Sequence, residues 1–265
     1  MEIRSVNNPR ISAWQGLKLK KGREREGLYL IEGTKLIADA LAANEEIVSL
    51  IIHDEKAERS EFADLLAGVE SSVERFRVSE PIIAKLTDTM TPQGIMAVVK
   101  KRDHDLASLL DQDRPTLVVI DQLQDPGNLG AIIRSADAAG VDGIIIGEKS
   151  VELYNPKVIR SAMGSIFHLP IVVDADLSIV MKELNRRGIR ILGTSPQAEL
   201  DYYSLDLTDN IAIVIGNESQ GLSTSLMRSV DEMMRIPIRG SAESLNAAMA
   251  TSIILYEHVR QQAKQ

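Results

Sequence analysis

The sequence predicts an α/β protein of two domains, with a mostly parallel sheet covered by helices in the larger, C-terminal domain. Three observations support this fold class. Short apolar runs alternate along the chain with segments of helical periodicity. In the second half these runs are continuously apolar, as in Ile211–Ile215, which is typical of parallel strands buried on both faces. Between the halves, Lys100–Arg114 is charged, weakly periodic and followed by Pro115, which favours a linker.

The first domain, expected at residues 1–105, begins with a basic arm and continues as a small α/β unit. Strands are expected at Leu28–Ile31, Ile47–Ile52, Arg75–Val78 and Ile95–Val99, and helices at Gly33–Ala43, Ser60–Leu66 and Pro81–Leu86. The helix after Gly33 places Ile37, Ala40 and Leu41 on one face, the pattern of a helix packed on a sheet. Trp14 in the arm is either a core anchor, the preferred interpretation, or a stacking ring for RNA.

After a linker at residues 106–114, the second domain is expected at residues 115–265. Its predicted strands are Thr116–Ile120, Gly143–Ile146, Leu169–Val173, Ile189–Gly193, Ile211–Ile215 and Met233–Ile238. Its predicted helices are Leu129–Ala139, Pro156–Met163, Leu177–Arg187, Leu222–Ser229 and Leu245–Gln262. Helices between buried strands are the connections that a parallel sheet requires.

Composition limits the chemistry available to the chain. The 265 residues are 44% apolar but only 3% aromatic, so an aliphatic core is expected. The chain has no cysteine, which excludes thiolate metal sites and cysteine nucleophiles. The four histidines (His53, His104, His168 and His258) are scattered without metal-ligand spacing, so no metal is expected. No apolar run has the length of a membrane span and the N-terminus has no signal-peptide pattern, so a cytoplasmic protein is expected.

The net charge of −8 is that of an ordinary acidic enzyme, but basic residues gather near the N-terminus. Residues 17–25 include Lys18, Lys20, Lys21, Arg23 and Arg25, with Glu24 as the one acidic residue. Such a cluster is either a solvated face or a contact for phosphate groups, and both interpretations stay open. RNA remains a possible partner of an acidic chain, because the local potential governs phosphate contacts.

Three segments of the second domain place turn-forming residues directly after predicted strands. The first is Asp125-Pro126-Gly127-Asn128, in which Asn128 is suited to cap the next helix and Arg134 follows within that helix. Arg134 by itself is either a solvated surface residue or a functional one. The glycine spacing does not match a dinucleotide-binding loop.

The second segment is Ile215-Gly216-Asn217-Glu218, where Gly216 and Gly221 permit tight backbone conformations near a ligand. The third runs from Ile236-Pro237-Ile238 to Ser244-Leu245-Asn246. Its proline fits a strand that is leaving the sheet. Ser244 is placed to cap the last helix, with Asn246 in the first turn.

Together these three segments resemble the motifs of the SpoU (TrmH-type) RNA ribose 2′-O-methyltransferases, which belong to the knotted SPOUT class. The resemblance covers roughly residues 115–265 and is specific, because three motifs agree at once. It implies a trefoil knot, a homodimer and S-adenosyl-L-methionine as cofactor.

The resemblance also implies roles for individual residues. The cofactor would be held by three loops, with contributions from Thr194, Gly216, Asn217, Ile236 and Leu245. Arg134, Asn128, Glu218 and Asn246 would form the catalytic end. Arg134 is expected to act as a charged clamp on the 2′-hydroxyl and a neighbouring phosphate rather than as a base, because its pKa is too high. Asn128 and Glu218 would hold Arg134 and the ribose.

The first domain resembles the L30e-like substrate-binding domain that is often fused to these enzymes, through Gly27–Gly33 and Thr91–Ile95. That resemblance makes Lys18, Lys20, Lys21 and Arg23 candidate RNA contacts, with ribosomal RNA favoured over tRNA. Two alternatives remain: methylation of a base nitrogen within the SPOUT class, and a non-catalytic RNA-binding factor.

Overall fold

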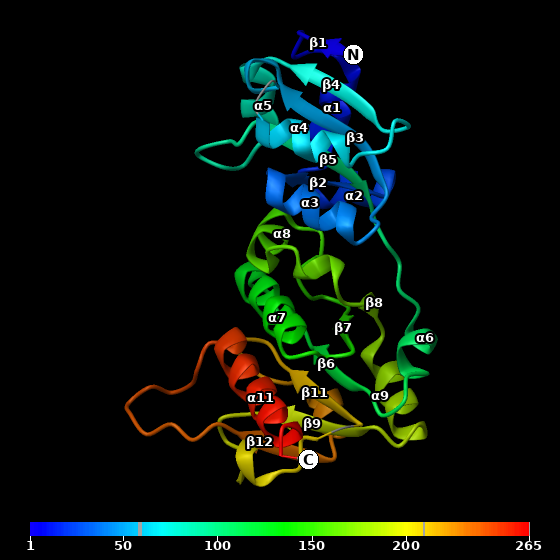
Figure 1. Ribbon diagram of the computed structural model, residues 1–265. Helices are drawn as coiled ribbons and strands as arrows, with labels where there is room; N and C mark the ends of the chain where they lie inside the picture. Colours follow the sequence, from blue (N-terminus) through cyan, green and yellow to red (C-terminus); the bar gives the residue numbers. More distant parts are fainter. Residues whose placement is uncertain (58–59, 209, 265) are drawn as a thin grey trace. The chain divides into compact units, whose positions relative to one another are not determined.

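The computed structural model describes residues 1–57, 60–208 and 210–264 (Figure 1). The chain divides into two compact units. Unit 1 comprises Met1–Arg102 and Tyr154–Arg160, and unit 2 comprises Asp103–Leu153 and Ser161–Gln265. The α/β fold class predicted from the sequence is confirmed, since strands and helices alternate in both units.

Unit 1 contains a mixed sheet of five strands. The strands are β1 (Glu2–Ile3), β2 (Leu28–Glu32), β3 (Ile47–His53), β4 (Glu74–Val78) and β5 (Ile95–Lys100), in the order β1-β4-β3-β5-β2. Strand β5 runs antiparallel to both of its neighbours, whereas β3 and β4 are parallel. The helices of the unit are α1 (Pro9–Gly16), α2 (Lys20–Glu26), α3 (Thr34–Ala42), α4 (Ser60–Ala67) and α5 (Glu80–Leu86), with a 3₁₀ turn at η1 (Asp54–Lys56).

The segment expected to be a basic arm is folded as the two helices α1 and α2. Asn8 caps α1 by accepting a hydrogen bond from the N–H of Arg10, and Pro9 occupies the first helical position. Trp14 is 7% exposed, and the centroids of its ring and the Phe76 ring are 5.2 Å apart in an edge-on arrangement. The core-anchor interpretation is therefore correct. The sequence signal for α1 is the pair Asn8-Pro9, a capping residue followed by proline.

Unit 2 is built on a sheet of seven strands in which every neighbouring pair is parallel, as predicted. The order is β10-β12-β9-β11-β6-β7-β8. These strands are β6 (Thr116–Ile120), β7 (Gly143–Gly147), β8 (Ile171–Ala175), β9 (Arg190–Thr194), β10 (Leu200–Asp201), β11 (Ile211–Ile215) and β12 (Glu232–Arg235). The carboxyl ends of β12, β9 and β11 therefore lie side by side.

The helices of unit 2 are α6 (Leu106–Leu110), α7 (Pro126–Ala138), α9 (Leu177–Arg186), α10 (Thr224–Met227) and α11 (Ala247–Gln262); α8 (Pro156–Ala162) spans the division between the units. Short 3₁₀ turns lie at η2 (Ser165–Phe167) and η3 (Tyr202–Ser204). Helices α7 and α11 lie side by side (Figure 1), and the hydroxyls of Ser135 and Ser252 are 2.7 Å apart between them. The buried face of α7 contains Ile132, Ile133 and Ala136.

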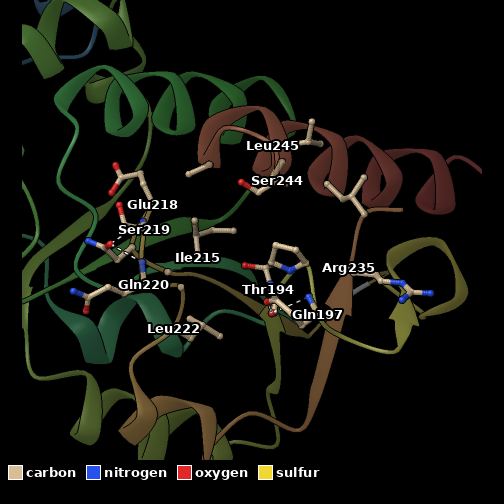
Figure 2. Close-up of a pocket in the computed structure, with 18 of the residues that line it drawn as sticks. Thr194, Gln197, Ile215, Glu218, Ser219, Gln220, Leu222, Arg235, Ser244 and Leu245 are labelled. Carbon is tan, nitrogen blue, oxygen red and sulfur yellow. Dashed lines mark hydrogen bonds between the residues drawn. The ribbon is translucent and has the colours of Figure 1, made fainter. Parts of the chain in front are cut away.

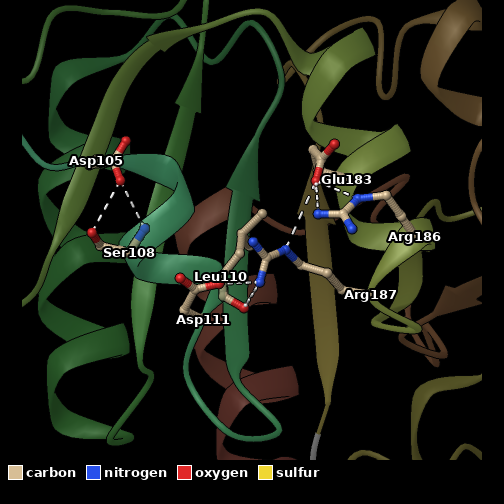
Figure 3. A network of polar contacts seen from close by, with 7 residues as sticks. All are labelled: Asp105, Ser108, Leu110, Asp111, Glu183, Arg186 and Arg187. Carbon is tan, nitrogen blue, oxygen red and sulfur yellow. Dashed lines mark hydrogen bonds and ion pairs between the residues drawn. The ribbon is translucent and has the colours of Figure 1, made fainter.

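Residues 106–114 are not simply a linker. Leu109 and Leu110 of α6 are buried in the core of unit 2. Arg187, at the end of α9, holds α6 in place by donating to the carbonyl of Leu110 at 2.8 Å and pairing with Asp111 at 2.6 Å (Figure 3). Because α6 buries only Leu109 and Leu110 and lies among charged residues, the sequence pattern of this stretch did not indicate a helix.

Candidate functional site

A cavity of about 1090 Å³ lies where the carboxyl ends of β9, β11 and β12 meet. In open α/β sheets this edge is the usual location of ligand sites. The loop residues Glu218, Ser219 and Gln220 lie on one side, and Thr194 and Gln197 on the other (Figure 2). The lining includes most of the predicted site residues: Asn128, Thr194, Gly216, Asn217, Glu218, Ile236, Leu245 and Asn246.

The loop after β11 is shaped by its own hydrogen bonds. Asn217 and Gly221 exchange two backbone hydrogen bonds of 2.9 Å and form an isolated bridge. The Asn217 side chain accepts from the N–H groups of Ser219 and Gln220, and donates to the carbonyl of Gln122. Asn217 therefore shapes the loop, and through Gln122 it holds the loop against the segment that leads into the first motif.

Gly216 is required for a different reason from the one expected. A Cβ at Gly216 would lie 2.3 Å from the carbonyl carbon of Gly221 and 2.5 Å from the nitrogen of Leu222. A side chain at this position would therefore disturb the backbone of the loop itself. The absence of a side chain at Gly216 leaves room for the backbone of Gly221 and Leu222 at the end of the same loop. Neither Gly216 nor Ser219 has a positive φ, so the backbone conformation at Ser219 accommodates a side chain.

The start of α7 is capped by Asp125 rather than by Asn128. The carboxylate of Asp125 accepts from the N–H of Asn128 at 2.8 Å, and Pro126 takes the first helical position. Asn128 consequently lies inside the first turn, with its amide available for other contacts. The prediction of an Asn128 cap failed because Asp125-Pro126 and Asn128 are both good helix starts.

The amide of Asn128 joins the three motifs. Its Nδ2 donates to Glu218 Oε1 at 3.1 Å, and its Oδ1 accepts from Asn246 Nδ2 at 2.7 Å. Glu218 also accepts from the backbone N–H groups of Gln124 at 3.2 Å and Asp125 at 2.9 Å. Glu218, Asn128 and Asn246 thus form one hydrogen-bonded chain at the rim of the cavity.

Glu218 is held as a carboxylate. Partial burial of Glu218 opposes its charged form, but hydrogen bonds from the Asp125 N–H, its own N–H, the Asn128 amide and the Gln124 N–H outweigh that effect and lower its pKa. A carboxylate with several donors and a lowered pKa is a poor proton acceptor. Glu218 is therefore suited to fixing the two loops and not to acting as a base.

The third motif leaves the sheet earlier than expected. Strand β12 ends at Arg235, so Ile236, Pro237 and Ile238 lie beyond the strand, and Ile236 and Ile238 line the cavity. The cap of α11 is Asn246, whose Oδ1 accepts from the N–H groups of Ala248 and Met249. Ser244, the predicted cap, lies outside the helix. Asn246 therefore both starts α11 and holds Asn128.

The sequence model of the SpoU rRNA Methylase family matches residues 115–256. The chain belongs to this family. A second model, the MRM3-like substrate binding domain, matches residues 8–97. The order of the two domains predicted from the motifs therefore agrees with known families.

Relatives of this SpoU chain extend over its full length. The 23S rRNA (guanosine(2553)-2′-O)-methyltransferase RlmP of Bacillus subtilis (strain 168) is 34% identical over 259 residues, 98% of this chain and 99% of the relative. The 23S rRNA (uridine(2479)-2′-O)-methyltransferase of Streptomyces viridochromogenes is 34% identical over 262 residues, covering 96% and 90%. Both matches include the first unit as well as the second.

Solved structures agree with the fold. The SpoU methyltransferase AviRb from Streptomyces viridochromogenes, in complex with AdoMet, superposes with a TM-score of 0.90 at 32% identity and covers 97% of this chain and 99% of its own. An AdoMet-bound rRNA methyltransferase from Sinorhizobium meliloti has a TM-score of 0.88 at 31% identity, with 98% and 97% covered.

Arg134 of this SpoU protein does not line the cavity of its own chain. It is exposed on α7, and its Nη1 donates to the Sδ of Met163 at 3.0 Å. Asn128 and Glu218, expected to hold Arg134, are instead bonded to each other. Sequence spacing could not reveal this, because it does not show which way a helix is rotated against its neighbours.

Thr194 lines the cavity, but its hydroxyl donates to the carbonyl of Val214 at 3.0 Å and so links β9 to β11. Sequence reasoning missed Gln197, whose Oε1 accepts from the hydroxyl of Ser195 at 2.8 Å in the same lining loop. It also missed Asp121, a buried carboxylate that accepts from the N–H of Ser223 at 2.7 Å. A polar residue directly after a buried strand was the available signal for Asp121.

The basic cluster of unit 1 separates into two groups. Arg23 is 3% exposed and donates to the carbonyl of Leu17 at 2.8 Å, so it supports the fold and is not accessible to a phosphate. Lys18 donates to the carbonyl of Thr87 at 3.0 Å and pairs with Asp88 at 2.7 Å. Lys20 and Lys21 are exposed.

Among the residues that the structure describes, no group of His, Asp and Glu side chains is arranged to hold a metal ion. In the same part of the chain, no helix combines the length and the apolarity needed to cross a membrane.

Proposed function

We propose that this protein transfers a methyl group from S-adenosyl-L-methionine to the 2′-oxygen of a ribose in ribosomal RNA. The hydrogen-bonded chain of Glu218, Asn128 and Asn246 carries the proposal, because it joins the three motifs at one cavity. Full-length relatives with this activity in their names support it. Because the substrate is ribosomal RNA, the cytoplasm is the proposed place of action.

The cavity suits the proposed cofactor. Apolar side chains of Leu222, Ile236 and Leu245 line it and could flank a purine ring, while the loops at Thr194 and Gly216 present backbone groups at strand ends. When bound, S-adenosyl-L-methionine supplies a methyl group on a sulfonium, which needs no further activation by the protein. The remaining task of the chain is to orient the acceptor and stabilise its developing negative charge.

Arg134 is the proposed source of that stabilisation. A guanidinium keeps its proton near pH 7, so Arg134 would act as a charged clamp and not as a base. The proton of the 2′-hydroxyl would pass to an oxygen of the neighbouring RNA phosphate that Arg134 holds, and the sulfur would leave as a neutral thioether. It lies outside the cavity of its own chain. We therefore place it at the cavity of the partner subunit in a homodimer.

An exposed apolar stripe on α11 supports the homodimer. Met249 is 63% exposed, Ile253 36% and Tyr256 53%, at positions three and four residues apart that share one helix face. Their helix packs beside α7, which carries Arg134. A dimer that covers this stripe would bury the apolar surface near Arg134.

A trefoil knot is also part of the proposal. Strand β12 lies beside β9, whereas α11 packs on α7, so the chain of residues 236–246 returns from one side of β11 to the other, which a knotted path would explain. Both ends of this segment line the cavity, through Ile236 and Ile238 at one end and Glu243–Asn246 at the other. A crystal structure in which this segment does not pass through a closed loop of the chain would contradict the knot.

Methyl transfer can be tested with purified protein, labelled S-adenosyl-L-methionine and unmodified ribosomal RNA. Nuclease digestion and mass spectrometry of the product would show the methyl group on ribose. A methyl group on a base nitrogen would favour the alternative SPOUT activity. Calorimetry that detects no cofactor binding would leave the non-catalytic RNA-binding alternative.

A further inference from the structure

Met163 has a backbone conformation that is unusual for its residue type. It directly follows α8, its φ is 50°, and the next residue, Gly164, has φ of 93°. The left-handed region is disfavoured for residues with a Cβ, and helices that end in it commonly use Gly or Asn. A strained residue of this kind persists where its surroundings or its function require the side chain.

The side chain of Met163 contacts Arg134. Nη1 of Arg134 donates to the Sδ of Met163 at 3.0 Å. In the described ranges of the chain, no carboxylate forms an ion pair with this guanidinium. Met163 is 52% exposed, so packing in the core does not explain a methionine at this strained position.

Two hydrogen bonds fix the segment around Met163 against α7. The hydroxyl of Ser161 donates to the carbonyl of Gly127 at 3.0 Å, near the start of the helix. Nδ1 of His168 lies 2.9 Å from Oδ2 of Asp137, near its end. The backbone of Met163 is therefore held between two anchors, with its thioether at the guanidinium of Arg134.

We propose that Met163 is a positioning residue that holds the guanidinium of Arg134 in the orientation required for methyl transfer. The inference rests on the proposed function of Arg134. A thioether is a weak, uncharged acceptor. It restricts the guanidinium without neutralising the positive charge that must face the reacting oxygen, as a carboxylate in the same place would do.

The first test compares Met163→Leu with Met163→Gln. Leucine keeps the apolar bulk without an acceptor, whereas glutamine supplies an amide oxygen on a side chain of similar length. Because misplacement of a catalytic group by about 1 Å costs about 100-fold, loss of this one contact should lower kcat on the order of 10-fold in Met163→Leu. Met163→Gln should recover most of that loss, and the Kd for S-adenosyl-L-methionine should stay unchanged in both variants.

Two controls separate positioning from a general structural role. Met163→Gly removes the strain of a Cβ in the left-handed region, so the thermal midpoint should be equal or higher while kcat falls as in Met163→Leu. Met90→Leu changes another exposed methionine and should keep wild-type kcat. A lower thermal midpoint in Met163→Gly would assign Met163 a structural role and overturn the inference.

A double-mutant cycle gives the decisive outcome. If Met163 acts through Arg134, Met163→Leu should cost nothing further in an Arg134→Ala background. Wild-type kcat in Met163→Leu, or the same loss in both backgrounds, would overturn the inference while leaving the proposed function intact. Absence of methyl transfer by the wild-type protein would contradict both.

Discussion

Two charged groups of the first two motifs have opposite surroundings. Glu218 accepts hydrogen bonds from Gln124, Asp125 and Asn128, all within its own chain. Arg134 lies six residues beyond Asn128, is exposed and donates to a thioether. The hydrogen bonds of Glu218 are therefore made within a single chain. The guanidinium of Arg134, in contrast, retains the capacity to bind an anionic group.

The same contrast occurs in unit 1. Arg23 and Lys18 are bonded to backbone carbonyls within the unit, while Lys20 and Lys21 are exposed and Lys20 pairs with the exposed carboxylate of Glu24 at 3.5 Å. A basic residue in a sequence can thus serve the fold or a ligand, and its hydrogen-bond partners distinguish the two cases. The predictions below test whether this distinction holds.

The largest effect is expected at Arg134. Arg134→Ala should lower kcat about 100-fold or more, because a lost electrostatic donor at a developing oxyanion costs that much. Arg134→Lys should recover only part of the rate, since it lacks the planar fork of the guanidinium. Cofactor affinity, measured by calorimetry, should not change. Near-wild-type turnover of the alanine variant would remove Arg134 from the mechanism.

Mixing two inactive variants tests which subunit Arg134 serves. A heterodimer of Arg134→Ala and Asn246→Ala subunits has one intact site only if Arg134 acts on the partner's cavity. Co-refolding the two variants should therefore restore a fraction of the activity. No recovery, in a mixture shown to contain heterodimers, would place Arg134 at the cavity of its own chain.

Gly216→Ala and Gly221→Ala should differ in stability. At Gly216 the new Cβ would meet backbone atoms at 2.3 Å, and overpacking of this kind costs about 1–3 kcal/mol. At Gly221 there is open space within 4 Å, and the positive φ of 69° costs about 1 kcal/mol. Chemical denaturation should rank Gly216→Ala as less stable, with weaker cofactor binding. Equal stability would show that the loop rearranges freely.

Glu218→Gln should weaken cofactor binding on the order of 5-fold, because its hydrogen bonds are charge-assisted but exposed to solvent. The folded state lowers the pKa of Glu218, so its stabilisation is present above the ordinary value of 4.5 and is lost as pH falls through the lowered pKa. The difference in thermal midpoint between wild type and variant should therefore shrink below about pH 4.5. A constant difference would mean that the charge of Glu218 is irrelevant.

The smallest effect is expected for the exposed lysines. Replacing Lys20 and Lys21 with glutamine should weaken RNA binding and reduce the salt slope by about 0.7–0.9 for each lost phosphate contact. Lys18→Gln should instead lower the thermal midpoint of unit 1, because it removes the contacts with Thr87 and Asp88. An unchanged salt slope for the double variant would make Lys20 and Lys21 part of a solvated face.

The sequence by itself determined the α/β class, the parallel sheet and the residues of three loops. These features follow from local patterns: continuous apolar runs such as Ile211–Ile215, and turn residues directly after them. Local competition between similar signals caused the errors at helix starts. Asp125 and Asn128 both suit a cap, as do Ser244 and Asn246, and the choice depends on what the other side chain can contact.

Only the tertiary structure decided the strand order, and with it the cavity. The neighbouring positions of β12, β9 and β11 bring Asn246 to Asn128, which are 118 residues apart. The structure also decided that Gly216 makes room for Gly221 and that Arg134 faces Met163. These contacts depend on how elements pack against each other, and neither periodicity nor spacing records the rotation of a helix or the order of strands.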